Sequence, residues 1–266
     1  MEHFVWSVDP VLFQFGSLRI FWYGLLFATA ILVGLQIMKW VFKREGKSVD
    51  LVDSGFIYTV IGIVVGARLG HCFFYDPAFY LANPMKILAV WEGGLASHGG
   101  GLGVIIALYF FIKKYNLNFM WLLDRMVLPT ALFAFFVRMG NLMNSEILGM
   151  KTDVSWAIVF TRVDTVPRHP AQLYEALAYL GIFFILFFIY KNKKVLQPGF
   201  LFGLFLTLVF SARFLVEFVK ERQASYSSDL VLNTGQALSI PFLLVGIGFI
   251  VYALKSNKLD SKSSLE

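Results

Sequence analysis

The chain has 266 residues, of which 58% are hydrophobic and 17% aromatic, and its mean hydropathy is +0.70. Charged residues make up only 15% and gather in short blocks, a composition that excludes an ordinary soluble domain. The net charge of +6 does not indicate nucleic-acid binding, because the lysines flank apolar runs, where they orient membrane spans. Cys72 is the only cysteine, so we expect neither a disulfide within the chain nor a thiolate metal site.

Seven apolar runs follow one another, each long enough to cross a bilayer. They predict an all-α integral membrane protein, with residues 1–266 forming a single polytopic domain. A polar loop at Tyr75–Glu92 separates the second and third spans, and another at Lys220–Asn233 precedes the seventh. The expected spans are Leu18–Phe42, Leu51–Phe74, Leu95–Ile112, Leu122–Met143, Gln172–Tyr190, a sixth that Pro198-Gly199 opens and that runs to Val219, and Gln236–Leu254.

The longest non-hydrophobic piece, Asn144–Arg168, lies between the fourth and fifth spans. Within it Trp156, Ile158 and Phe160 alternate with Ala157 and Val159, as the residues of a short strand do. The sequence therefore predicts a small extracytoplasmic cap at residues 144–170.

Basic residues predict the orientation of the spans. They concentrate after the odd-numbered spans, which places those loops in the cytoplasm, the N-terminus outside and the C-terminus inside. The bias is not absolute, because Lys151, Arg162, Arg168, Lys220 and Arg222 fall on the expected outer side. The cytoplasmic set is Lys43, Arg44, Lys47, Lys113, Lys114, Lys191, Lys193, Lys194, Lys255, Lys258 and Lys262.

The stretch Phe136–Gly149 places an arginine, two asparagines and a glutamate at the end of an apolar span, where such residues are costly. On a helix, Arg138 and Asn141 share one face, which Ser145 continues. That face is suited to binding an anion. The alternative is that Arg138 snorkels to the interface or forms an ion pair in helix packing.

Polar groups on five spans fall at a similar depth. Counted at helical rise from the cytoplasmic ends, they lie about 21 to 25 Å up, in the outer third of a hydrocarbon layer about 30 Å thick. Arg213 and Glu217 are four residues apart and predict an ion pair, whereas Arg68 and Arg138 have no such acid in their own helices. The surplus of positive charge favours an anionic ligand, which at that depth is a phospholipid phosphate. The five groups are Tyr23, Arg68, His98, Arg138 and Arg213.

Two histidine-bearing segments leave a functional and a packing interpretation open. His98 is expected in the first turn of the third span, where the helix dipole favours a neutral imidazole that could act as a base. Gly99 and its neighbouring glycines either let a headgroup or peptide approach or let helices pack. His169 and Gln172, beside Pro170, either cap the fifth span or support the site.

These residues resemble those of a known family, the bacterial prolipoprotein diacylglyceryl transferases. The resemblance covers most of the chain. This sequence departs from the family pattern in Val137 and Leu142, where glycine and phenylalanine are usual, and in Val209, where some members have tyrosine. The segments that carry the resemblance are Trp22-Tyr23-Gly24, Gly66-Ala67-Arg68, Gly93–Gly100, Arg138–Gly149, His169–Glu175, and Arg213 with Glu217.

The resemblance implies an enzyme that transfers the diacylglyceryl group of phosphatidylglycerol to the lipobox cysteine of prolipoproteins, forming a thioether and releasing glycerol phosphate. It implies a multi-pass protein of the bacterial cytoplasmic (inner) membrane, with its site in the outer part of the bilayer and membrane lipids around it.

The resemblance also implies roles for individual residues. Arg138 and Arg213 would hold the phosphate and stabilise the leaving group, and His98 would take the thiol proton, although the phosphate ester or Tyr23 could serve instead. No cofactor or metal is expected, since His3, His71, His98 and His169 lack ligand-like spacing with acids. The implied substrate-binding residues are Tyr23, Arg68, Gly99, Arg138, Asn141, Glu146, Gly149 and Glu217, with His169 and Gln172 supporting them.

A phospholipid or anion transporter that uses the arginine layer as a binding site is the alternative. Transporters commonly show internal repeats and broken helices in paired positions, and the sequence shows neither. The transferase is therefore the favoured interpretation.

Overall fold

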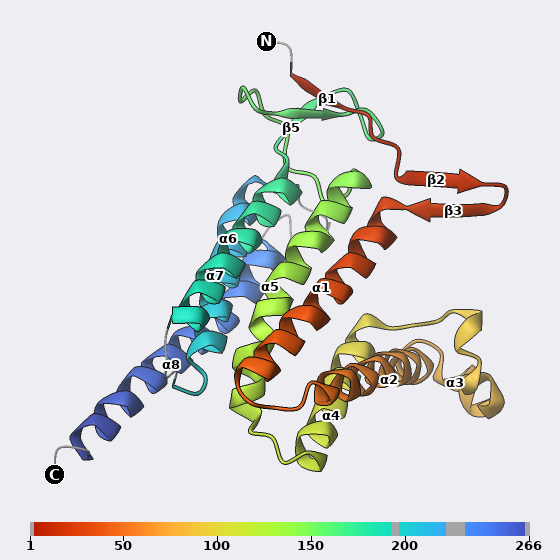
Figure 1. The fold of residues 1–266 in the computed structure, drawn as a ribbon. Coiled ribbons are helices and arrows are strands. Elements are labelled where there is room, and N and C mark those ends of the chain that lie inside the picture. Colours follow the sequence, from red (N-terminus) through yellow and green to blue (C-terminus); the bar gives the residue numbers. More distant parts are fainter. Residues whose placement is uncertain (1–2, 193–196, 222–231, 264–266) are drawn as a thin grey trace. The chain divides into compact units, whose positions relative to one another are not determined.

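The computed structural model describes residues 3–192, 197–221 and 232–263 (Figure 1). It divides into two compact units. The first comprises Met1–Ile37 and Leu123–Glu266, and the second comprises Met38–Leu122. The α-helices are α1 (Trp22–Arg44), α2 (Asp50–Phe74), α3 (Pro77–Ala82), α4 (Ser97–Lys114), α5 (Phe119–Met143), α6 (Ala171–Asn192), α7 (Phe200–Val216) and α8 (Thr234–Ser263).

Six of the described helices are long and apolar enough to cross a membrane, as expected of an integral membrane protein. The helix expected as the third span, α4, is not among them. It has 18 residues, begins at Ser97, carries His98 and a group of glycines in its first two turns, and ends with two lysines. The count of seven spans and their orientation remain predictions. The six spans are Trp22–Arg44, Asp50–Phe74, Phe119–Met143, Ala171–Asn192, Phe200–Val219 and Thr234–Ser256.

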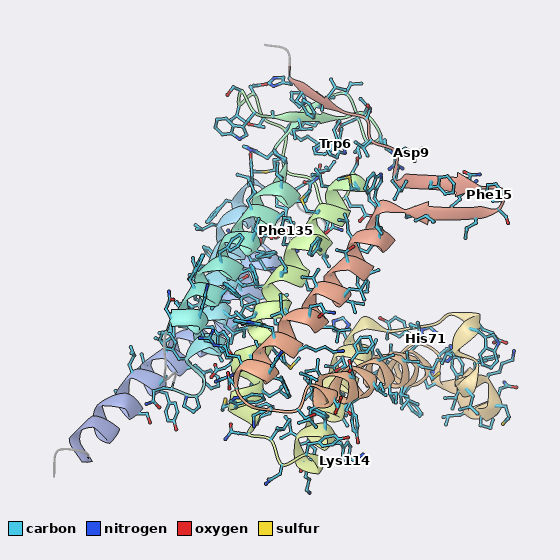
Figure 2. All side chains as sticks on the ribbon, in the orientation of Figure 1. Trp6, Asp9, Phe15, His71, Lys114 and Phe135 are labelled. Atoms are coloured by element: carbon cyan, nitrogen blue, oxygen red, sulfur yellow. The ribbon has the colours of Figure 1, made fainter. Side chains whose placement is uncertain are left out.

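The first span begins later than the sequence predicts. Residues Leu18–Phe21 form strand β3, which pairs antiparallel with β2 (Val11–Phe15), and α1 begins only at Trp22. Phe15 lies at the tip of this hairpin, with 76% of its surface exposed (Figure 2). The apolar run misled the prediction because hydropathy alone does not separate a short apolar strand from the first turn of a helix.

The predicted polar loops hold more structure than expected. The Tyr75–Glu92 loop contains α3 and two 3-10 helices, Pro84–Leu88 and Val90–Glu92. Part of the Lys220–Asn233 loop, residues 222–231, lies outside the described residues, as do Lys193, Lys194 and Arg222.

A three-stranded sheet lies at the end of the first unit where α5 stops and α6 begins (Figure 1). The predicted strand is confirmed as β4 (Ile158–Phe160), which pairs antiparallel with β5 (Pro167–Arg168) and parallel with β1 (Phe4–Trp6). The participation of the N-terminal strand was not predicted. Ile158 and Phe160 of β4 form a buried cluster with Leu142 and Leu148, against which Trp6, Met139 and Leu173 pack.

At the opposite end of α5, a buried carboxylate caps another helix. Asp124 is fully buried and accepts hydrogen bonds from the backbone N–H groups of Gly199 (2.7 Å) and Phe202 (2.8 Å), at the start of α7. An acidic side chain at a helix N-terminus satisfies free donors and complements the dipole. Asp124 thereby fixes the start of α7 against α5.

In the second unit, α2 and α4 approach closely through glycines. A Cβ atom built on Gly62 would lie 2.6 Å from the Gly103 oxygen, and one built on Gly70 would lie 2.8 Å from Gly99 Cα. Small residues spaced four apart let the backbones of membrane helices come this close. Gly99 therefore has a packing role in the structure.

Candidate functional site

Arg138 is the centre of a buried polar network in the first unit. Its Nε lies 2.7 Å from Oε2 of Glu175, which projects from α6, and its Nη1 donates a hydrogen bond of 3.2 Å to Asn141 Oδ1. The Glu175 side chain is fully buried, and that of Arg138 is 14% exposed. Arg138 therefore does not snorkel. It forms an ion pair between helices, which the search for acids within its own helix could not find.

The network continues from Asn141 into the segment that follows α5. Asn141 Nδ2 donates to Glu146 Oε2 at 3.0 Å, and Asn144 Nδ2 donates to the other carboxylate oxygen at 3.1 Å. Ser145 and Ile147, on either side of Glu146, have positive φ angles of 55° and 57°. Such backbone is strained for a β-branched residue and often occurs at functional sites. This strained turn holds Glu146 against both asparagines.

Two glycines let other groups approach the network. A Cβ atom built on Gly140 would lie 2.6 Å from Tyr23 Cδ2, so the Tyr23 ring packs on the α5 backbone. A Cβ atom built on Gly149 would lie 2.5 Å from the His169 oxygen, and the Gly149 N–H donates to that oxygen at 2.9 Å. The contact with Gly140 places Tyr23 beside the Arg138 segment, as the depth count predicts.

Glu217 pairs with Lys220 rather than with Arg213, the partner expected from sequence. Lys220 Nζ lies 3.4 Å from Glu217 Oε2 and 3.4 Å from Glu175 Oε1. At Glu217 the chain passes from α7 into a 3-10 helix, Glu217–Val219, which brings Glu217 and Lys220 together three residues apart. Arg213 lies in the last turn of α7 and forms no ion pair with a described carboxylate.

Gln172 is fully buried in the first turn of α6, three residues before Glu175. Neither amide atom of Gln172 has a hydrogen-bond partner among the described residues. His169 Nδ1 lies 3.1 Å from the Tyr174 hydroxyl, which accepts a hydrogen bond of 2.8 Å from Trp156 Nε1. His169 is thus bound within the cap segment and the start of α6.

Arg168 ties the cap to the segment that follows α7. It pairs with Asp164 and Glu221 and donates a hydrogen bond to the Gly149 oxygen. The hydrogen bonds from Arg168 lower the pKa of the Asp164 carboxyl, and those to Asp164 raise the pKa of the Arg168 guanidinium.

The remaining predicted site residues, Arg68, His98 and Gly99, belong to the second unit. Arg68 is 3% exposed, and its guanidinium donates to the backbone oxygens of Lys86, Ile87, Gly93 and Gly94. These bonds organise the loop after α2. His98 is exposed in the first turn of α4.

The structure thus groups only part of the predicted set. Tyr23, Arg138, Asn141, Glu146 and Glu217 come together in the first unit, while the polar layer across five spans stays a prediction. Sequence reasoning missed Glu175 and Lys220. Glu175 and Lys220 were detectable in principle as ionisable residues near the outer ends of apolar runs, the usual mark of an intramembrane network.

Comparison with known proteins shows which family the chain belongs to. A family profile described as prolipoprotein diacylglyceryl transferase matches residues 10–252. The chain is 51% identical over 251 residues to a phosphatidylglycerol–prolipoprotein diacylglyceryl transferase of Tolumonas auensis, covering 94% of this chain and 97% of the relative. It is 49% identical over 264 residues to a protein of the same name from Chloroherpeton thalassium, with 98% of each covered, and 45% identical over 260 residues to one from Bacteroides fragilis, with 93% and 94% covered. The chain belongs to the prolipoprotein diacylglyceryl transferase family.

Proposed function

We propose that this protein transfers the diacylglyceryl group of phosphatidylglycerol to the lipobox cysteine thiol of prolipoproteins. The names of its relatives state this donor and acceptor, and the chain covers nearly the whole length of those relatives. The observation that carries the proposal is the buried network around Arg138, which sets a guanidinium at the end of a membrane span. A lipid phosphate is the anion within reach of a guanidinium at that position in the membrane.

The reaction is a displacement at carbon. The cysteine sulfur attacks the carbon of the diacylglyceryl group that is bonded to the phosphate oxygen. A C–S bond forms, the bond between that carbon and the oxygen breaks, and glycerol phosphate leaves with the electron pair. Arg138 and Arg213 bind the phosphate and stabilise the charge that grows on it, as preorganised cations do at other phosphate sites. Tyr23, Asn141, Glu146, Gly149 and Glu217 position the lipid headgroup or the peptide, with His169 and Gln172 supporting them.

The thiol proton must be removed, because the thiolate is the nucleophile and a free thiol has a pKa of about 8.5. His98 takes this proton in the proposed mechanism. Its exposed position at the start of α4 leaves the imidazole open to a substrate. Arg68 and Gly99 support His98, since Arg68 holds the loop that leads into α4 and Gly99 packs α4 on α2.

The protein acts in the bacterial cytoplasmic membrane as a seven-span enzyme, with α4 as the remaining span. The N-terminus, the cap at residues 144–170 and the site lie toward the outer face. The pairing of β1 with β4 supports placing the N-terminus and the cap on one side.

The proposal is tested with purified protein, phosphatidylglycerol and a lipobox peptide. We expect a thioether-linked peptide from the wild type and a loss of at least about 100-fold in turnover for Arg138→Ala. Turnover is counted per folded molecule, because the change also leaves Glu175 without one of its cations. A folded wild-type protein that forms no thioether but carries phosphatidylglycerol across proteoliposomes would support the transporter instead. His98→Gln with near-normal turnover would remove His98 as the base and leave the transferase intact.

A further inference from the structure

The role of Glu175 is not explained by lipid binding alone. Its carboxylate is fully buried in a membrane helix and has one cation at each oxygen, Arg138 at 2.7 Å and Lys220 at 3.4 Å. A buried carboxylate is costly unless it is paired, and removing one partner of such a pair leaves an uncompensated charge. Glu175 is therefore placed to hold cations, since an anionic phosphate would be repelled by it.

The contacts of Arg138 show which edge of its guanidinium is engaged. Nε faces Glu175, and Nη1 donates to Asn141. The Nε contact is an ion pair without an aligned hydrogen bond, because Glu175 Oε2 has no hydrogen-bond partner. With Nε facing Glu175 and Nη1 bonded to Asn141, Nη2 and the second hydrogen of Nη1 remain for a ligand.

The charges of the cluster fit a phosphodiester. Arg138 and Lys220 pair with Glu175 and Glu217, so their charges balance. Arg213 lies in the last turn of α7, four residues before Glu217, forms no ion pair with a described carboxylate, and adds one positive charge. The phosphodiester of phosphatidylglycerol carries one negative charge. Glu146 reaches the cluster through Asn141, but its side chain is exposed, so solvent screens it.

We propose that Glu175 is a positioning residue, which orients the Arg138 guanidinium toward the phosphate of the lipid donor and is itself held in place by its ion pair with Lys220. The proposal rests on the proposed transferase function. Lys220 acts through Glu175 by holding its second oxygen, and Glu217 holds Lys220. The chain of contacts therefore runs from Arg138 on α5, through Glu175 on α6, to the segment after α7.

The test compares Glu175→Gln, Glu175→Asp, Lys220→Met and the double variant Glu175→Gln with Lys220→Met. For Glu175→Gln we expect kcat to fall about 100-fold, the loss that misplacement of a catalytic group produces, while KM for the peptide stays unchanged. Glu175→Asp keeps the charge but shortens the side chain, so we expect a clear loss there too. Rescue of kcat by Asp would reduce Glu175 to a charge-balancing role and overturn the proposal.

Non-additivity is the sharper readout. If Lys220 acts through Glu175, the double variant is no slower than Glu175→Gln alone, whereas independent roles would multiply the two losses. Lys220→Met alone should lose less than Glu175→Gln, about 10-fold. Multiplicative losses would overturn the assignment of Lys220.

The matched control is Asp124→Asn, which neutralises a buried carboxylate at the other end of α5. We expect it to lower the thermal stability and to leave kcat per folded molecule unchanged. If Glu175→Gln behaves in the same way, Glu175 is only structural. If Glu175→Gln does not fold, the kcat values of Lys220→Met and Glu175→Asp provide the test. A wild type without thioether product overturns both proposals, whereas an active wild type with a fully active Glu175→Gln overturns this one alone.

Discussion

At the scale of single residues, the absence of a side chain at Gly140 brings Tyr23 to the network around Arg138. The Tyr23 ring packs directly on the α5 backbone there, and a Cβ atom on residue 140 would lie 2.6 Å from Cδ2 and 3.1 Å from Cε2 of the ring. Contacts this short cannot be accommodated without moving the ring. The position of Tyr23 is therefore coupled to residue 140.

For Gly140→Ala we expect displacement of Tyr23 and a fall in kcat/KM of about 10- to 100-fold, measured as thioether formation at several phosphatidylglycerol concentrations. Gly181→Ala is the control, because a Cβ atom at Gly181 meets nothing within 4 Å. Full activity of Gly140→Ala would show that the enzyme does not depend on this position of Tyr23.

Individual ion pairs were the least predictable feature from the sequence. Helical spacing placed Arg138 and Asn141 on one face, where the structure joins them by a hydrogen bond. The same spacing assigned Glu217 to Arg213, whereas Glu217 pairs with Lys220. Spacing along one helix reports neighbours on that helix alone. The Arg138–Glu175 pair depends on how α5 and α6 pack, which no local pattern contains.

At the scale of elements, the pairing of α2 with α4 depends on glycines that lie at the contact between them. Gly103 faces Gly62 and Gly66, and a Cβ atom on Gly103 would clash with the Gly62 oxygen. Gly101, two residues earlier on the same helix, has open space where its Cβ atom would be. Alanine substitution at these two positions therefore distinguishes the effect of close helix packing from the effect of helix propensity.

We expect Gly103→Ala to destabilise the protein by about 1–3 kcal/mol, the usual cost of overpacking a close contact. Gly101→Ala should leave stability unchanged or raise it slightly, since alanine favours helix over glycine. Reversible unfolding in detergent measures both. Equal stability of the two variants would contradict the packing described for Gly103.

The cap should respond to pH through Asp164. Because hydrogen bonds from Arg168 lower the pKa of Asp164 in the folded protein, its stabilising contribution is fully present above the ordinary aspartate pKa of about 3.9 and is lost as the pH falls through the lowered pKa. Asp164→Asn should therefore have a lower Tm than the wild type at pH 5 to 8. The difference in Tm between the two proteins should shrink as the pH falls below about 3.9.

Thermal unfolding from acid to neutral pH measures this difference between the wild type and Asp164→Asn. The control is Asp153→Asn, an exposed carboxylate of the cap segment, which should leave Tm unchanged across the range. A difference for Asp164→Asn that persists at the acid end would show that the effect does not come from ionisation of Asp164.

At the scale of the whole molecule, hydropathy and charge predicted most of the fold. They gave the helices that became α2, α4, α5, α6 and α7 to within about three residues, and alternation gave β4, whereas α8 continues to Ser263, beyond its predicted end at Leu254. They missed β3, because Leu18–Phe21 is as apolar as the helix it precedes, and they missed β1, whose partner β4 is far along the chain. Local patterns carry no information on such distant pairing.

The proposed seven-span topology is tested by single cysteines in a Cys72→Ser background. With α4 crossing the membrane, Ser17→Cys and Met85→Cys react with a membrane-impermeant maleimide in intact cells, and Lys113→Cys reacts only after permeabilisation. All three positions are exposed. Equal labelling of Met85→Cys and Lys113→Cys in intact cells would mean that α4 does not cross.

The most direct measurement of the central claim counts both products of one reaction. Purified protein is incubated with headgroup-labelled phosphatidylglycerol and a lipobox peptide, and the thioether-linked peptide and released glycerol phosphate are quantified together. The account predicts one glycerol phosphate for each thioether, and neither product when the peptide cysteine is replaced by serine. Release of glycerol phosphate without thioether, or an unmodified peptide with folded protein, would contradict it.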